Sequence, residues 1–102
     1  MTLMERVISE GLATVFERDF GGMPAPWGQC PPNVSDWVKE LTALPSDSVT
    51  AHWMSRHPDG RRWIGYKAGT YIAEQATKAS GKSAAELANV STEEILRLAR
   101  AN

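Results

Sequence analysis

Glu10 is the first candidate functional residue. It is a carboxylate and begins the motif E-G-L-A at positions 10–13. On a helical wheel its side chain lies nearly opposite the main apolar stripe of the surrounding pattern. The ordinary interpretation is a solvated carboxylate, for which Arg6 one turn earlier is a candidate partner in an interaction worth roughly 0.3–0.5 kcal/mol. The neighbouring Gly11 is expected to weaken a long helix, and the close approach of another helix would explain why glycine occurs there.

The second candidate is the phenol of Tyr66, which lies in the motif G-Y-x-x-G between Gly65 and Gly69. Aromatic residues at helical spacing most often belong to the core. Tyr66, however, faces away from the apolar stripe of its own helical pattern, so its hydroxyl group is expected to point into a second interface or a cleft. The two glycines cost about 1 kcal/mol each relative to alanine, which favours another backbone packed close against them.

Few other residues are of the types that commonly do chemistry. His52 and His57 are the only histidines, and their spacing of five residues puts them on different helical faces without the further ligands of a zinc pattern. Cys30 is the only cysteine, and no general base stands beside it in the sequence. A single-chain enzyme that uses Cys30 or a histidine is therefore kept only as a third hypothesis.

Length and charge exclude several classes of protein. A chain of 102 residues is expected to form one helical domain over residues 1–102. The net charge of -1, with basic and acidic residues interspersed, argues against nucleic-acid binding. One cysteine excludes a disulfide scaffold, the charged N-terminus does not fit a signal peptide, and no stretch is long and apolar enough to span a membrane. We therefore expect a cytoplasmic protein.

The elements that must position these residues are predicted to be helices. Apolar residues at three- and four-residue spacing predict a first helix that starts at a capping box of Thr2 and Glu5. Gly21 and Gly22 are expected to end it. Residues 21–32 then form a loop with four prolines, and Trp27 in its middle would pin the loop to the body of the protein.

Shorter helices and one long central helix are predicted to follow. A second helix is expected over about 33–44, and Pro45 is expected to begin a third. The fourth, over about 63–80, has apolar residues on one face and a second uncharged stripe on the opposite face, formed by Trp63, Tyr66, Thr70, Ala73 and Thr77. Two S-x-x-E capping boxes begin the closing helices. The fold class expected is all-α, a single compact domain of five or six helices with a long Pro-rich loop after the first helix.

Several short motifs occur together in a recognisable order. They are E-G-L-A on a helix, a loop that contains Pro26-Trp27, a Trp-bearing helix pair, G-Y-x-x-G on a helix, and a closing acidic helix. In this order they resemble the C-terminal half of a bacterial family of predicted zinc-dependent proteases, which is described as a domain of unknown function within the gluzincin-like group. The resemblance covers most of the chain.

The resemblance implies a zinc site built from an H-E-x-x-H helix and a downstream glutamate, which maps onto Glu10 as the third zinc ligand. Zinc would activate water for peptide hydrolysis, and Tyr66 would stabilise the oxyanion. No H-E-x-x-H motif exists in this sequence. The chain alone is therefore expected to bind no zinc and to be inactive, as a truncated or degenerate descendant of a complete protease.

Two partners follow from this interpretation. The first is a missing N-terminal half that carries H-E-x-x-H and covers the face with Glu10, Gly11 and the second uncharged stripe. The other is a second copy of the chain, a homodimer that covers the same face. The alternative function is a small helical interaction module without enzymatic role, in which four tryptophans form a groove for a partner: Trp27, Trp37, Trp53 and Trp63.

Overall fold

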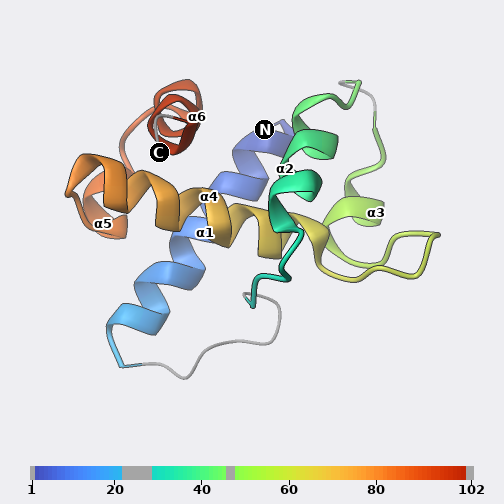
Figure 1. The fold of residues 1–102 in the computed structure, drawn as a ribbon, viewed down its shortest axis with the longest axis horizontal. Coiled ribbons are helices and arrows are strands. Elements are labelled where there is room, and N and C mark those ends of the chain that lie inside the picture. Colours follow the sequence, from blue (N-terminus) through green and yellow to red (C-terminus); the bar gives the residue numbers. More distant parts are fainter. Residues whose placement is uncertain (1, 22–28, 46–47, 101–102) are drawn as a thin grey trace.

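Six helices make up the fold in the part of the chain that the computed structural model describes, which is residues 2–21, 29–45 and 48–100. They are α1 (Leu3–Asp19), α2 (Val34–Thr42), α3 (Thr50–Met54), α4 (Ile64–Ser80), α5 (Ala84–Leu87) and α6 (Thr92–Arg100). These ranges contain no strand, only an isolated bridge between Arg56 and Arg62. The predicted all-α class is confirmed. Helix α4 runs through the centre, α1 crosses it, and the shorter helices lie around this pair (Figure 1).

Helix α1 begins where its local sequence predicts. The side chain of Thr2 accepts a hydrogen bond from the backbone N–H of Glu5, and the Glu5 carboxylate accepts one from the backbone N–H of Thr2. This reciprocal pair satisfies two N–H groups that would otherwise lack a partner at the helix start. Gly21 follows the helix with a φ of +93°, in the left-handed region that glycine adopts without steric cost.

The backbones of α1 and α4 touch at two glycines. A Cβ atom added to Gly11 would lie 2.1 Å from the carbonyl oxygen of Gly69, and one added to Gly69 would lie 2.2 Å from the carbonyl oxygen of Val7. Backbone atoms on both sides leave no flexible side chain that could move away. The expectation that Gly11 and Gly69 meet another backbone is confirmed: Gly11 lies against Gly69, and Gly69 lies against Val7 and Gly11.

This contact corrects the expectation that a missing partner covers the face with Gly11. Gly11 is buried, and α4 of the same chain covers it. The second stripe of α4 is also largely covered, because Thr70 is 0% and Ala73 is 1% exposed. The helical spacing of these residues predicts that they share one face of α4, but it does not show which part of the protein packs against that face. The homodimer stays a prediction, without the uncharged stripe as its basis.

Helix α3 is shorter than predicted. Val49 is extended, and the helix begins at Thr50 rather than at Pro45. Its end packs on the first turn of α4, where a Cβ atom at Gly65 would lie 2.2 Å from the sulfur of Met54. Gly65 therefore lets α3 lie directly against the start of α4.

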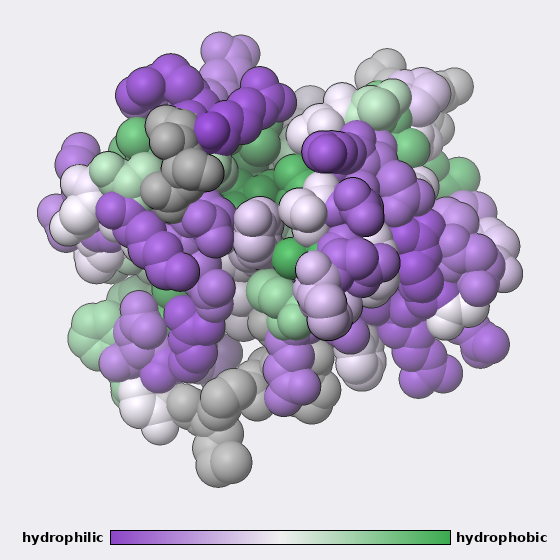
Figure 2. Space-filling view, in the orientation of Figure 1, coloured by the Kyte–Doolittle hydropathy of each residue, from purple (hydrophilic) through white to green (hydrophobic). Residues whose placement is uncertain are grey.

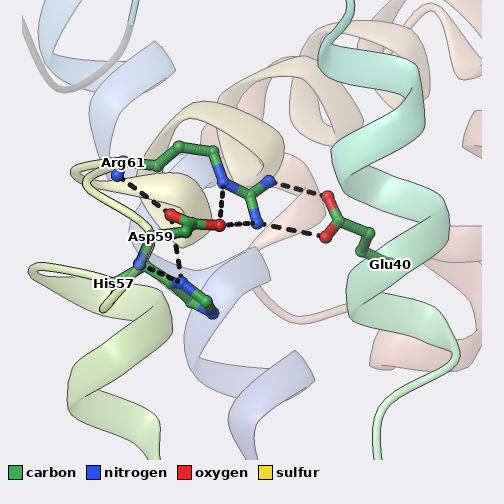
Figure 3. Close-up of polar contacts among 4 residues, drawn as sticks. All are labelled: Glu40, His57, Asp59 and Arg61. Atoms are coloured by element: carbon green, nitrogen blue, oxygen red, sulfur yellow. Dashed lines mark hydrogen bonds and ion pairs between the residues drawn. The ribbon is translucent and has the colours of Figure 1, made fainter.

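The loop between α3 and α4 is tied to α2 by charge. Arg61 donates to both carboxylate oxygens of Glu40, at 2.7 and 3.1 Å, and to Asp59 within its own loop (Figure 3). Hydrogen bonds from Arg61 lower the pKa of Asp59 to about 2. The guanidinium carbon also lies 5.4 Å from the ring centre of Trp37 and 5.9 Å from that of Trp53. Two carboxylates and two indoles thus fix the loop that leads into α4.

The closing helices α5 and α6 pack against both α1 and α4. Ser83 and Glu86 form the second complete capping box. At α6 the hydroxyl group of Ser91 accepts from the backbone N–H of Glu94, while the Glu94 carboxylate pairs with Arg97. Hydrophilic residues cover most of the face in Figure 2, and apolar ones emerge in a seam between α6 and α2. No helix in the described ranges is long and apolar enough to cross a membrane.

We predict that Gly69→Ala destabilises the protein. Helix propensity alone predicts a gain of about 1 kcal/mol, whereas the clash with Val7 predicts a loss of roughly 1–3 kcal/mol in the free energy of unfolding. Urea unfolding followed by circular dichroism measures the sign. Ala79→Gly, at an exposed position of the same helix, is the control and should cost about 1 kcal/mol. A Gly69→Ala variant more stable than wild type would contradict the close crossing.

Candidate functional site

An open groove of about 740 Å³ lies between α1, α3 and the start of α4. Helix α1 forms one wall, with Arg6, Glu10, Ala13, Thr14 and Glu17. The other wall consists of uncharged residues: Thr50, Ala51, Met54, Ser55, Trp63 and Tyr66. Glu10 and Tyr66, the two site residues singled out in the sequence, therefore line the same groove from different helices.

Glu10 is half-buried in this wall of the groove. The expected ion pair with Arg6 is not formed, because none of the ion pairs of the described chain involves either residue. The ordinary interpretation therefore loses its ion pair, while the carboxylate itself stays partly exposed to solvent. The backbone carbonyl of Glu10 accepts a hydrogen bond of 2.8 Å from Thr14, another residue of the groove.

Tyr66 lies in the first turn of α4 and is half-buried. The hydroxyl group of Thr70, one turn later, donates to the backbone carbonyl of Tyr66 at 2.7 Å. Beside it, Trp63 is the N-cap residue of α4 and has a φ of +57°. Non-glycine residues adopt this left-handed conformation at a cost of roughly 1–3 kcal/mol, and such strain often occurs at functional sites. The strained backbone at Trp63 thus belongs to a residue that lines the groove.

The described residues of this chain do not by themselves fit a zinc ion. A catalytic zinc takes three protein ligands, and no group of three or more His, Cys, Asp or Glu side chains in the described ranges could hold a metal ion. The groove offers two carboxylates, Glu10 and Glu17, two helical turns apart. Glu10 could supply one of the three protein ligands, and the other two would have to come from elsewhere.

The histidines lie elsewhere and have structural contacts. His57 packs its ring on Trp53 at 4.7 Å between centroids, and its Nδ1 accepts a hydrogen bond of 3.1 Å from the backbone N–H of Asp59 (Figure 3). His52 packs near His57, with ring centres 6.0 Å apart. Neither lines the groove. A single-chain enzyme built on a histidine has no support in this arrangement.

Cys30 is also separate from the groove. Its thiol donates to the backbone carbonyl of Lys67 at 3.5 Å. Burial raises the pKa of this thiol above its ordinary value, and the charge of Glu74 raises it further. A nucleophilic cysteine needs the opposite shift, because the thiolate is the reactive form.

The described tryptophans do not form the single groove that an interaction module would need. Trp37 and Trp53 flank Arg61, whereas Trp63 lines the groove with Glu10. Trp27, and Pro26 before it, lie outside the described residues. The sequence interpretation missed Glu17 and Met54 as groove residues. Glu17 could have been found from its spacing of seven residues after Glu10, whereas Met54 is placed only by tertiary packing.

One family model matches the chain, over residues 1–97, and its description is "Predicted Zn-dependent protease (DUF2268)". No curated protein and no solved structure matches the chain at a significant level. The family match includes both walls of the groove.

We predict that Cys30 reacts slowly with iodoacetamide. Because the pKa of Cys30 is raised, the rate of alkylation should be lower than that of free cysteine at pH 8. Its pH profile should also have a midpoint above that of free cysteine. Mass spectrometry of the alkylated protein over time measures both. A midpoint below that of free cysteine would revive the hypothesis of a catalytic thiol.

Proposed function

Because the chain belongs to the family of predicted Zn-dependent proteases, we propose that it is the helical domain that supplies the downstream glutamate of a protease site and is not competent alone. Glu10 is the would-be third zinc ligand. Tyr66 is the residue that stabilises the oxyanion. The substrate is a peptide, and it is hydrolysed only when the site is completed by an H-E-x-x-H helix that this sequence lacks.

The observation that carries this proposal is the meeting of Glu10 and Tyr66 in one groove. They are 56 positions apart in the sequence. Gly11 directly follows Glu10, and Gly69 comes three residues after Tyr66, so the glycine contact between α1 and α4 is close to both in the sequence. A half-buried carboxylate without an ion-pair partner in the described chain is suited to pair with a cation. A phenol hydroxyl group in the same groove is suited to donate to developing negative charge on a carbonyl oxygen.

The groove is open, which agrees with a site that needs a further element. Two imidazoles and a general base are required for the family's chemistry, and the groove contains neither histidine of this chain. We propose that a segment or chain carrying H-E-x-x-H packs over the groove and faces Glu10. This partner replaces the homodimer as the preferred one, because the groove holds the candidate site residues.

The test begins with the genomic DNA upstream of the codon for Met1, or with a chain that co-purifies with this one, as the source of H-E-x-x-H. In the completed protein, Glu10→Gln should lower zinc affinity by more than the roughly 10–100-fold that outer partners of a metal site contribute. Tyr66→Phe should lower kcat by about 100-fold or more with zinc content unchanged. Zinc is measured by elemental analysis and activity with a quenched fluorescent peptide.

Glu93→Gln is the matched control, because Glu93 is exposed on α6 and does not line the groove. It should leave zinc content and activity unchanged. Full retention of both in the Glu10→Gln variant would rule out the ligand role. By itself, this chain should show no stoichiometric zinc and no peptidase activity, and activity of the isolated chain would contradict the proposal.

A further inference from the structure

We propose that the groove selects extended peptides by charge at two points: a cationic group of the peptide pairs with Glu17, and an anionic group about five residues away pairs with Arg6. The inference rests on the proposed function, because it assigns a substrate class to the same groove. It differs in what it requires, since peptide binding at these two points needs neither zinc nor the H-E-x-x-H segment.

The spacing of the two charges supports the proposal. Arg6 and Glu17 are eleven residues apart on α1, which is three helical turns with a difference of about 20° around the axis. Both side chains therefore lie on one line along the groove, roughly 16 Å apart at the backbone. An extended peptide advances about 3.3 Å per residue, so five residues span this distance. Glu10 lies between the two, one turn from Arg6.

The charges of this wall are available to a ligand. Elsewhere in the described part of the chain, ion pairs join Arg18 near the end of α1 to Glu74, Arg61 to Glu40, and Arg97 to Glu94. None involves Arg6, Glu10 or Glu17, although all three project from the same face of α1 into the groove. A ligand that brings opposite charges would supply the partners that the fold does not.

The opposite wall has no charged side chain. It offers the hydroxyl groups of Thr50 and Ser55 and the apolar surfaces of Met54 and Trp63. Such a wall can contact the backbone and the uncharged side chains of a peptide, but it does not distinguish the charges at the two ends of the bound segment. Selection by charge therefore depends on α1 alone.

Charge complementarity also favours a peptide over a polyanion. The groove contains two carboxylates and one guanidinium group, so the phosphates of a nucleic acid would meet net repulsion. A peptide with a basic and an acidic residue in the right spacing matches the groove at both ends.

Binding is tested with the isolated chain by two-dimensional ¹⁵N NMR at low ionic strength. The probes are blocked hexapeptides in which Lys and Asp flank four alanines, in both orders, and a neutral peptide with Gln and Asn at the same places. We expect one of the charged peptides to bind about three- to fivefold more tightly than the neutral one, the size of effect typical of exposed ion pairs. Its shifts should map to the groove, including the indole signal of Trp63.

Two variants assign the selectivity to Glu17. Glu17→Gln should remove the preference for the charged peptide, and Glu17→Lys should shift it toward a peptide with Asp at both ends. Glu93→Gln should leave the preference unchanged. Glu17 is exposed, so these variants should fold, and their spectra show whether they do.

Equal binding of charged and neutral peptides, or no binding of any at millimolar concentration, would overturn the inference. Selective binding that Glu17→Gln does not alter would also overturn it. None of these outcomes decides the proposed function, which is tested separately by the zinc content and activity of the completed protein. Conversely, selective binding together with full activity of the Glu10→Gln variant would sustain the charge selection and remove the proposed role of Glu10.

Discussion

The contact of two glycines, Gly11 and Gly69, sets the geometry of everything else in this protein. With no side chain on either, the backbones of α1 and α4 approach more closely than any other residue pair would allow. Glu10 directly precedes Gly11, and Tyr66 lies one turn before Gly69. The crossing point therefore determines how far apart the two walls of the groove stand at the residues of chemical interest. A methyl group at this point would move the walls as well as weaken the fold.

Around this crossing, the structure separates charges that stabilise the fold from charges that face the groove. Arg61 is held by Glu40 and Asp59 and lies near two indoles, and it fixes the loop that leads into α4. Glu10 in the groove belongs to no such pair in the described chain, and it stands opposite Tyr66 and the strained backbone of Trp63. The chain belongs to the family of predicted Zn-dependent proteases, and its described residues include no group of three or more His, Cys, Asp or Glu side chains that could hold a metal ion.

Local features could be predicted from the sequence, and features that depend on distant packing could not. The capping boxes at Thr2 and Ser83 were readable because both partners lie within four residues. Gly11 and Gly69 could each be recognised as needing a close neighbour, but no local signal pairs one with the other. The start of α3 was placed too early, because Pro45 is compatible with a first helical turn and equally with a loop. The burial of Thr70 and Ala73 could not be predicted either, because no local signal shows which other helix packs against a given face.

The most direct measurement is a nuclear Overhauser spectrum of the isolated chain in solution. We predict strong cross-peaks between the Hα protons of Gly11 and Gly69. Interior glycines of two helices show such Hα contacts only when the backbones touch. Absence of the cross-peak between the two glycines, in a folded and assigned sample, would contradict the account.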